Sequence, residues 1–175
     1  FFKEGQTQYL DAIDNQSYGY CVTKWTNLTD AGEVASNTAT GGVNTDFPVF
    51  RLADVYLMLG EAVARGGTGS STEDVLGYLN QLRQRAFGDN YETNGKLTAA
   101  DLTVNFYLDE RARELYWECS RRTDLIRFGK FTTASYLWQW KGGTKDGKAV
   151  DSKYNIYPIP TSDLTANPNL HNENY

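Results

Sequence analysis

Apolar residues recur with helical spacing in the middle of the chain, from about residue 50 to residue 86. Two amphipathic helices are predicted there, over residues 50–65 and from about Thr72, because apolar positions lie three and four residues apart. Gly66 and Gly67 end the first helix, and the short loop after it predicts an antiparallel hairpin. The predicted apolar faces are Leu52, Val55, Tyr56, Leu59, Ala62 and Val63 in the first helix, and Val75, Leu79, Leu82 and Ala86 in the second.

A third, longer helix is predicted to begin at the capping sequence of residues 98–101 and to reach about Cys119. A further helical piece is expected over residues 122–128. Because Cys119 continues the apolar stripe of the third helix, it is interpreted as a small buried hydrophobe. A disulfide between Cys21 and Cys119 remains open, since sequence does not show whether their Cα atoms approach.

Three glutamates recur every four residues along this third helix, and three arginines sit three or four residues after a glutamate. This carboxylate ladder is interpreted as bracing between neighbouring segments. The alternative is a pair of acids for glycoside hydrolysis, but a nearby cation lowers a carboxyl pKa, whereas a general acid needs a raised one. The residues are Glu110, Glu114, Glu118, Arg113, Arg121 and Arg122.

Both ends of the chain lack helical periodicity. Residues 1–49 are rich in Gly, Ser, Thr and Asn, and residues 134–175 contain Gly142, Gly143 and three prolines. The predicted fold is therefore mainly α, with a helical body over residues 50–133 between long irregular segments.

Composition excludes several classes of function. A net charge of −5 argues against nucleic-acid binding, because phosphate contacts need a basic surface. No apolar run approaches the length that spans a bilayer. The only histidine, His171, lies in the polar tail, and neither zinc-ligand spacing nor a calcium loop is present, so no cofactor and no metal are predicted.

The aromatic run at residues 136–140 is the strongest candidate for ligand binding. Tyr136, Trp138 and Trp140 offer flat apolar faces for sugar rings, and Gln139 could bind hydroxyls. If the backbone is extended, Trp138 and Trp140 share one side. The alternative is that these aromatics pin the tail onto the helices.

Four sequence blocks occur in a fixed order along the chain. They are Arg51-x-Ala53-Asp54-x-x-Leu57-x-x-x-Glu61-Ala62, Leu79-Asn80-x-x-Arg83-x-Arg85-Ala86, Asp109-Glu110-Arg111-x-x-Glu114-Leu115-x-x-Glu118-x-x-Arg121-x-x-Asp124-Leu125-Ile126-Arg127, and Pro158-Ile159-Pro160 with Asn167-Pro168. With these blocks in this order, the chain resembles the SusD/RagB family, the glycan- and nutrient-binding lipoproteins of Bacteroidetes-type outer membranes. Arg51, Glu61, Asp124 and Arg127 fall at family positions, where we interpret them as salt-bridge and helix-end residues.

The resemblance implies tetratricopeptide-like helical hairpins and the C-terminal part of one SusD-like domain, with residues 1–49 packing on a missing N-terminal part. It further implies non-catalytic binding of an oligo- or polysaccharide at the cell outer membrane and delivery to a SusC-like TonB-dependent transporter. A lipid anchor would then be carried by the missing N-terminus. Two alternatives remain: a helical scaffold for protein–protein interaction, and a glycosidase.

Overall fold

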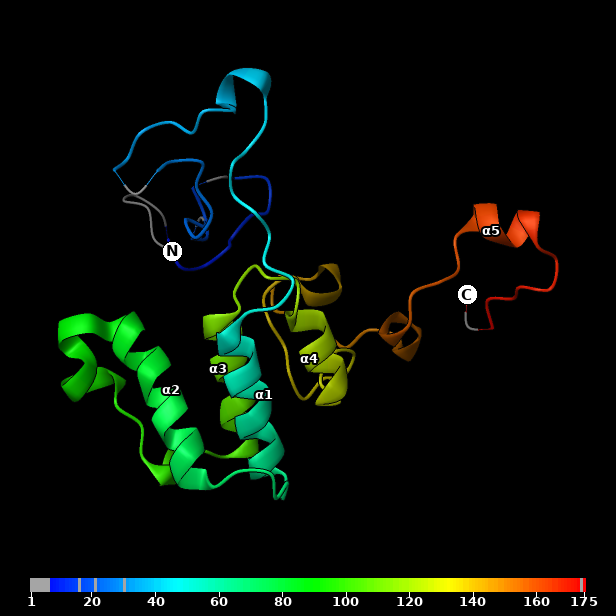
Figure 1. Cartoon of the computed structure of the whole chain (residues 1–175). Coiled ribbons are helices and arrows are strands. Elements are labelled where there is room, and N and C mark those ends of the chain that lie inside the picture. Colours follow the sequence, from blue (N-terminus) through cyan, green and yellow to red (C-terminus); the bar gives the residue numbers. More distant parts are fainter. Residues whose placement is uncertain (1–6, 16, 21, 30, 174) are drawn as a thin grey trace. The chain divides into compact units, whose positions relative to one another are not determined.

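The computed structural model describes residues 7–15, 17–20, 22–29, 31–173 and 175 (Figure 1). This part of the chain is mainly α, as predicted, with five α-helices, short 3-10 turns, one π-helical turn (Tyr91–Gly95) and only isolated β-bridges. The helices are α1 (Leu52–Ala64), α2 (Thr72–Phe87), α3 (Val104–Glu114), α4 (Arg121–Arg127) and α5 (Thr161–Ala166).

The chain divides into two compact units. The first unit is Val22–Arg121, and the second joins the described residues between 7 and 20 to Arg122–Tyr175. Within the second unit, two neighbouring side chains hold the backbone of Leu10. Nε1 of Trp140 donates to the Leu10 carbonyl at 2.8 Å, and the Leu10 N–H donates to Oε1 of Gln139 at 3.0 Å. The division of the chain at residues 49 and 133 stays a prediction.

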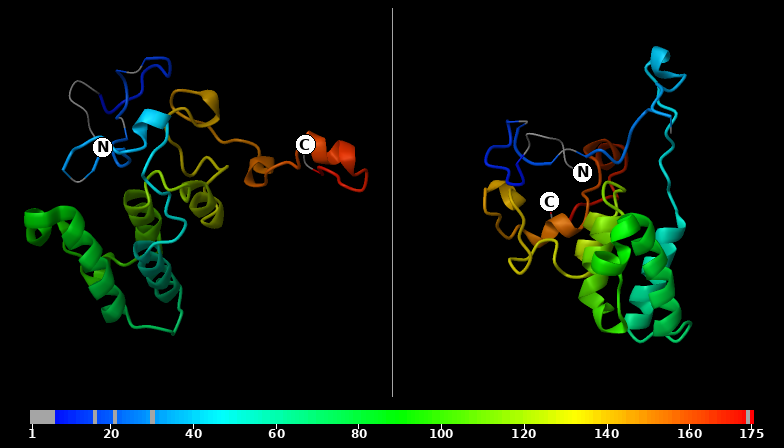
Figure 2. Two further views of the ribbon diagram at one scale, coloured as in Figure 1. Left: turned by 45° about the horizontal axis from the view of Figure 1, so that its top comes forward. Right: turned by 90° about the vertical axis from the view of Figure 1, so that its left-hand side faces the viewer.

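In the first unit, α1 and α2 form the predicted antiparallel hairpin, and α1 also packs against α3 (Figure 2). The Ser71 side chain accepts from the Asp74 N–H and the Asp74 carboxylate accepts from the Ser71 N–H, so a capping box starts α2. The predicted stripe of α2 is confirmed at Val75, Leu79 and Leu82, all of which are buried. The largest side chains buried to below 2% exposure are Tyr107, Leu57, Leu79, Leu108 and Val75.

The buried face of α1 differs from the predicted one. Leu52 and Val55 are exposed, although Tyr56, Leu59 and Val63 do pack partly against the core. Apolar residues occupy most of the circumference of α1, so their spacing alone does not select which face turns inward. The buried residues of α1 are Ala53, Leu57, Gly60 and Glu61.

The third helix is shorter than predicted at both ends. The capping box of Thr98 and Asp101 is present, but it opens only the 3-10 turn Ala99–Asp101. Helix α3 begins at Val104, where the Thr103 side chain caps it. At the other end it stops at Glu114.

Backbone conformation explains why α3 stops before Cys119. Trp117 and Cys119 both have a φ of 60°, which lies in the left-handed region and is incompatible with a right-handed helix. Cys119 is exposed, so its interpretation as a buried hydrophobe is wrong. The other cysteine, Cys21, lies outside the described residues.

The carboxylate ladder braces separate segments, as predicted. Nη1 of Arg51 lies 2.5 Å from Oε1 of Glu114, and Nε of Arg51 lies 2.6 Å from Oε2 of Glu118. Nη2 of Arg51 also donates to the Glu114 carbonyl at 2.6 Å, so this arginine satisfies the C-terminal end of α3. Lys24 pairs with Glu118 as well. These contacts join the start of α1 and the segment around Lys24 to the end of α3.

Helix α2 is joined to α3 by a second part of the ladder. Arg83 donates from Nε and Nη2 to the two Glu110 oxygens at 2.6 and 2.7 Å. The predicted contact between Arg113 and Glu110 is confirmed at 2.8 Å. The predicted helical spacing of Arg121 and Arg122 from Glu118 is wrong, because Glu118 and both arginines lie beyond the end of α3.

The interpretation of the family-position residues as ion-paired is confirmed. Arg127 and the buried Asp124 form an ion pair of 2.9 Å on α4. Nε of Arg65 lies 2.7 Å from Oε1 of the buried Glu61 on α1. Arg51 belongs to the ladder described above.

Glu118→Gln is expected to reduce the acid sensitivity of folding. Burial of Glu118 raises its pKa, but hydrogen bonds from Arg51 and Lys24 outweigh burial and lower the pKa below its ordinary value of 4.5. The stability contributed by such a carboxyl is complete above its unfolded-state pKa and is lost as pH falls through the folded-state pKa. Urea unfolding at about pH 7 and about pH 3 should therefore show a smaller acid-induced loss in the variant than in the parent.

The matched control for this experiment is Glu92→Gln, because Glu92 is an exposed partner of Lys96. An acid-induced loss as large in Glu118→Gln as in the parent would contradict the assigned role of Glu118.

Gly60→Ala is expected to destabilise the intact protein by about 1–3 kcal/mol through overpacking. A Cβ at Gly60 would lie 2.5 Å from Cε1 of the buried Tyr107 ring, so α1 and α3 would have to separate. This cost exceeds the gain in helix propensity, which is about 1 kcal/mol for alanine over glycine. Thermal unfolding measures the difference.

Gly77→Ala is the matched control, because Gly77 lies inside α2 and a Cβ there would meet nothing within 4 Å. It should raise stability by up to about 1 kcal/mol. Equal effects of the two substitutions would contradict close packing at Gly60.

Candidate functional site

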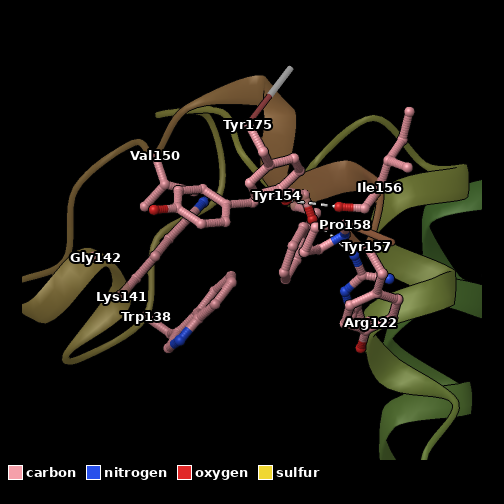
Figure 3. A pocket seen from close by; sticks show the side chains of 11 residues that line it. Arg122, Trp138, Lys141, Gly142, Val150, Tyr154, Ile156, Tyr157, Pro158 and Tyr175 are labelled. Carbon is pink, nitrogen blue, oxygen red and sulfur yellow. Dashed lines mark hydrogen bonds between the residues drawn. The ribbon is translucent and has the colours of Figure 1, made fainter. Parts of the chain in front are cut away.

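A pocket of about 450 Å³ opens in the second unit (Figure 3). Residues from the start of α4, from the loop after it and from the C-terminal tail come together around this pocket, which has the size of many small-ligand sites. We name it the Trp138 pocket. It is lined by Arg122, Phe131, Trp138, Lys141, Gly142, Val150, Tyr154, Ile156, Tyr157, Pro158 and Tyr175.

Stacked aromatic rings form one wall of the Trp138 pocket. The Trp138 and Phe131 rings stack with centroids 6.3 Å apart and an interplanar angle of 26°. Trp138 is 39% exposed, so part of its ring remains available to a ligand. Gly147 adopts a φ of 78°, and a Cβ at this position would collide with the Trp138 carbonyl oxygen. Glycine at 147 therefore lets the loop close behind Trp138.

Arg122 and two tyrosines form another part of the lining. Cζ of Arg122 lies 3.8 Å from the centroid of the Tyr157 ring, a cation–π distance. Nη2 of Arg122 donates to the Tyr154 carbonyl at 2.7 Å. Arg122 is thereby held in place by the tail while its guanidinium remains in the pocket lining.

Tyr175 contacts other residues of the tail beside the pocket. Its hydroxyl lies within hydrogen-bond distance of two carbonyls, those of Lys153 (3.0 Å) and Ile156 (2.8 Å). The Tyr175 ring meets Tyr154 edge to face, with centroids 6.5 Å apart. The tail is thus fastened by its own aromatic side chains.

Lys141 is a buried cation at the base of the Trp138 loop, with 3% of its surface exposed. Its Nζ donates to the carbonyls of Thr133 and Tyr136, both at 2.7 Å, and lies 4.6 Å from the centroid of the Trp138 ring. Burial lowers the pKa of Lys141. These contacts fix the loop that carries Trp138.

The three aromatic residues predicted as a sugar site occupy different surroundings. Trp138 lines the pocket, whereas Tyr136 and Trp140 are absent from its lining. Trp140 has a φ of 66°, so the extended backbone that would place both tryptophans on one side does not occur. Instead, Trp140 and Gln139 hold Leu10, so they pin the tail to an N-terminal segment, whereas the alternative predicted contacts with the helices. The Tyr136 ring is tilted against Trp138, with centroids 6.4 Å apart.

Sequence reasoning missed most of the pocket lining. Arg122, Phe131, Tyr154 and Tyr175 come together from distant positions, and no local pattern connects them. The cluster of Tyr157 with the prolines at 158 and 160 was the one available signal, since it marked a tail that an aromatic residue could anchor.

The chemistry of the Trp138 pocket suits binding. Aromatic faces can stack on the apolar C–H faces of sugars, and the Arg122 guanidinium carries N–H donors for hydroxyls. None of the described residues in the lining is a carboxylate. Across the described part of the chain, no three His, Cys, Asp or Glu side chains gather as a metal site, and no helix has the length and apolarity to cross a bilayer.

Comparison with known proteins gives the family. The model of the SusD family matches residues 2–175. The chain belongs to the SusD family. The Starch-binding protein SusD of Bacteroides thetaiotaomicron is 43% identical over 166 residues, which make up 94% of this chain and 28% of that protein. A SusD-like protein of Formosa agariphila is 34% identical over 122 residues, or 70% of this chain and 22% of that protein.

Solved structures of SusD-type proteins share the fold. Surface glycan-binding protein A from Bacteroides thetaiotaomicron superposes with a TM-score of 0.62 at 25% identity, over 82% of this chain and 29% of its own. A SusD superfamily protein from Bacteroides vulgatus gives a TM-score of 0.54 at 34% identity, over 73% of this chain and 27% of that protein. The predicted SusD-like, tetratricopeptide-like helical fold is confirmed. The chain spans less than a third of the length of each of these relatives.

Proposed function

We propose that this chain is part of a protein that binds a glycan at the bacterial cell surface without catalysing its cleavage. The observation that carries the proposal is the 43% identity to a protein named for starch binding, over almost the whole chain. The similarity to a surface glycan-binding protein supports it further.

Within this chain, the Trp138 pocket is the proposed sugar contact. Trp138 supplies the stacking face and Arg122 the hydrogen-bond donors. Tyr136, next to Trp138, contributes only to the edge of this surface, and Trp140 contributes indirectly by holding the Leu10 segment. The described residues of the lining include no carboxylate, which supports binding in place of hydrolysis, since glycosidases use paired acids.

The family further supports a location and a partner for the whole protein. We propose attachment to the outer membrane through a lipid anchor outside this chain, with the glycan passed to a SusC-like TonB-dependent transporter. Purification of the intact protein from membranes under mild detergent should recover that transporter with it. Its absence from the purified material would count against the transfer role.

Trp138→Ala is expected to weaken glycan binding by the intact protein about 5- to 30-fold, equivalent to about 1–2 kcal/mol of stacking. Calorimetric titration with maltoheptaose, a soluble starch fragment, measures the change. Trp117→Ala is the control, because Trp117 is an exposed tryptophan of the first unit, and it should leave affinity unchanged.

Unchanged affinity in Trp138→Ala would remove the Trp138 pocket from the sugar site. If the parent protein binds neither maltoheptaose nor any polysaccharide on a glycan array, glycan binding itself is wrong. Release of reducing ends from a bound glycan would instead establish an enzyme.

A further inference from the structure

A separate pocket of about 550 Å³ lies in the first unit, at the end of α3. Its lining combines basic side chains, two ladder glutamates and one tryptophan, and we name it the cationic pocket. Its lining includes Lys24, Trp25, Arg51, Arg85, Arg113 and Glu114.

Cations outnumber carboxylates in and beside the cationic pocket. Each ladder glutamate is shared by two basic residues: Glu110 pairs with Arg83 and Arg113, Glu114 with Arg51 and Arg85, and Glu118 with Arg51 and Lys24. Five cations thus face three carboxylates. The ladder therefore carries an excess of two positive charges, of which the Asp46 carboxylate in the adjoining hollow offsets one, in a chain whose net charge is −5.

The excess positive charge lies on the two outer arginines. Arg85 and Arg113 have side chains that are 58% and 56% exposed, whereas Arg51 and Arg83 are 23% and 13% exposed. Arg51, Arg83 and Lys24 match the three ladder carboxylates in number, and exposed ion pairs stabilise a fold little. Only Nη2 of Arg85 bonds to Glu114, so among its contacts in the described part of the chain the other guanidinium N–H groups remain free for a ligand.

An aromatic surface adjoins these arginines. Trp25 lines the cationic pocket and also a neighbouring hollow of about 250 Å³. The Trp25 and Phe47 rings stack there, with centroids 5.8 Å apart and an interplanar angle of 26°. Asn27, Thr45 and Asp46 supply polar atoms around the same hollow. A flat apolar face, polar groups and a cationic fork therefore lie side by side.

We propose that the first unit carries a second ligand site that binds an acidic saccharide, with the sugar ring on Trp25 and its carboxylate between Arg85 and Arg113. Guanidinium N–H groups form charge-assisted hydrogen bonds with carboxylates, and the Nε and Nη1 groups of Arg85 can supply them to a ligand. A neutral glycan would make no use of these charges. The site is independent of the Trp138 pocket and of the ligand assigned to it.

The test is calorimetric titration of the intact protein with trigalacturonate and with its methyl ester, which has the same rings but no charge. Trigalacturonate should bind at least tenfold more tightly, and its affinity should fall as salt screens the charges. The double variant Arg85→Gln/Arg113→Gln should lose at least tenfold in affinity for trigalacturonate. Lys96→Gln/Lys145→Gln removes the same charge from exposed ion pairs outside the pocket and should change nothing.

The variants separate this proposal from the preceding one. Trp138→Ala should leave trigalacturonate binding unchanged, and Trp25→Ala should weaken it. Loss of binding in Trp138→Ala with none in the arginine double variant would place the acid sugar in the Trp138 pocket and overturn the proposal. Equal affinity for the methyl ester, no binding of trigalacturonate, or arginine-dependent binding to anionic lipid vesicles alone would overturn it as well.

Discussion

Arg51→Met is expected to lower the free energy of unfolding of the intact protein by about 3 kcal/mol, the usual loss when one partner of a buried ion pair is removed. Three acceptor groups depend on this guanidinium, because it binds the side chains of Glu114 and Glu118 and the Glu114 carbonyl. Its removal leaves Glu118, which is 7% exposed, with Lys24 as its remaining ion-pair partner. Urea unfolding followed by circular dichroism measures the loss.

The matched control is Arg85→Met, which removes a cation from the same Glu114 carboxylate. Because the Arg85 side chain is mostly exposed, its loss should cost less than about 1 kcal/mol. Comparable losses of stability in the two variants would show that the greater burial of Arg51 does not make it more important to the fold than Arg85. An unchanged unfolding midpoint in Arg51→Met would contradict the bracing role altogether.

The contrast between these arginines shows what sequence alone could and could not predict. Glutamates at four-residue steps indicated a structural ladder, and the structure confirms it. The spacing named Arg113 as a partner of Glu110, because such contacts are local on one helix. Arg51, 63 residues before Glu114 in sequence, was identified as ion-paired only by family resemblance. Its partners depend on how α1 packs against α3.

The helix boundaries and faces were likewise predictable where the deciding contacts are local, and were mispredicted where those contacts are distant in sequence. The start of α2 was predictable, because the capping box at Ser71 and Asp74 uses residues three positions apart. The inward face of α1 and the end of α3 were mispredicted, since both are decided by tertiary contacts. For example, the indole N–H of Trp25 donates to the carbonyl of Trp117. Trp117 lies beyond the end of α3, although the predicted helix included it.

The candidate site was only partly predictable for a related reason. The aromatic run included Trp138, which lines the Trp138 pocket, but the same reasoning valued Trp140 equally. The structure separates them through the left-handed backbone at Trp140, which turns its indole to Leu10. Nothing in the sequence marks Lys141 as buried, because lysine is rarely found in a core without a partner.

Lys141 is therefore the residue whose replacement should most affect the Trp138 pocket. Its ammonium group satisfies the carbonyls of Thr133 and Tyr136 and lies over the Trp138 ring. A buried carbonyl that loses its donor costs about 1–3 kcal/mol, and the cation–π contact adds roughly 1 kcal/mol. The loop from Thr133 to Trp138 consequently depends on one side chain.

Lys141→Met is expected to lower the stability of the second unit by about 3 kcal/mol, because methionine fills similar space but donates no hydrogen bond. The displaced Trp138 ring should change the tryptophan fluorescence and weaken maltoheptaose binding. Lys148→Met is the control, since Lys148 is exposed in the same loop and its replacement should alter stability by less than about 0.5 kcal/mol. Lowered stability with unchanged fluorescence and affinity would show that Lys141 supports the loop without positioning Trp138.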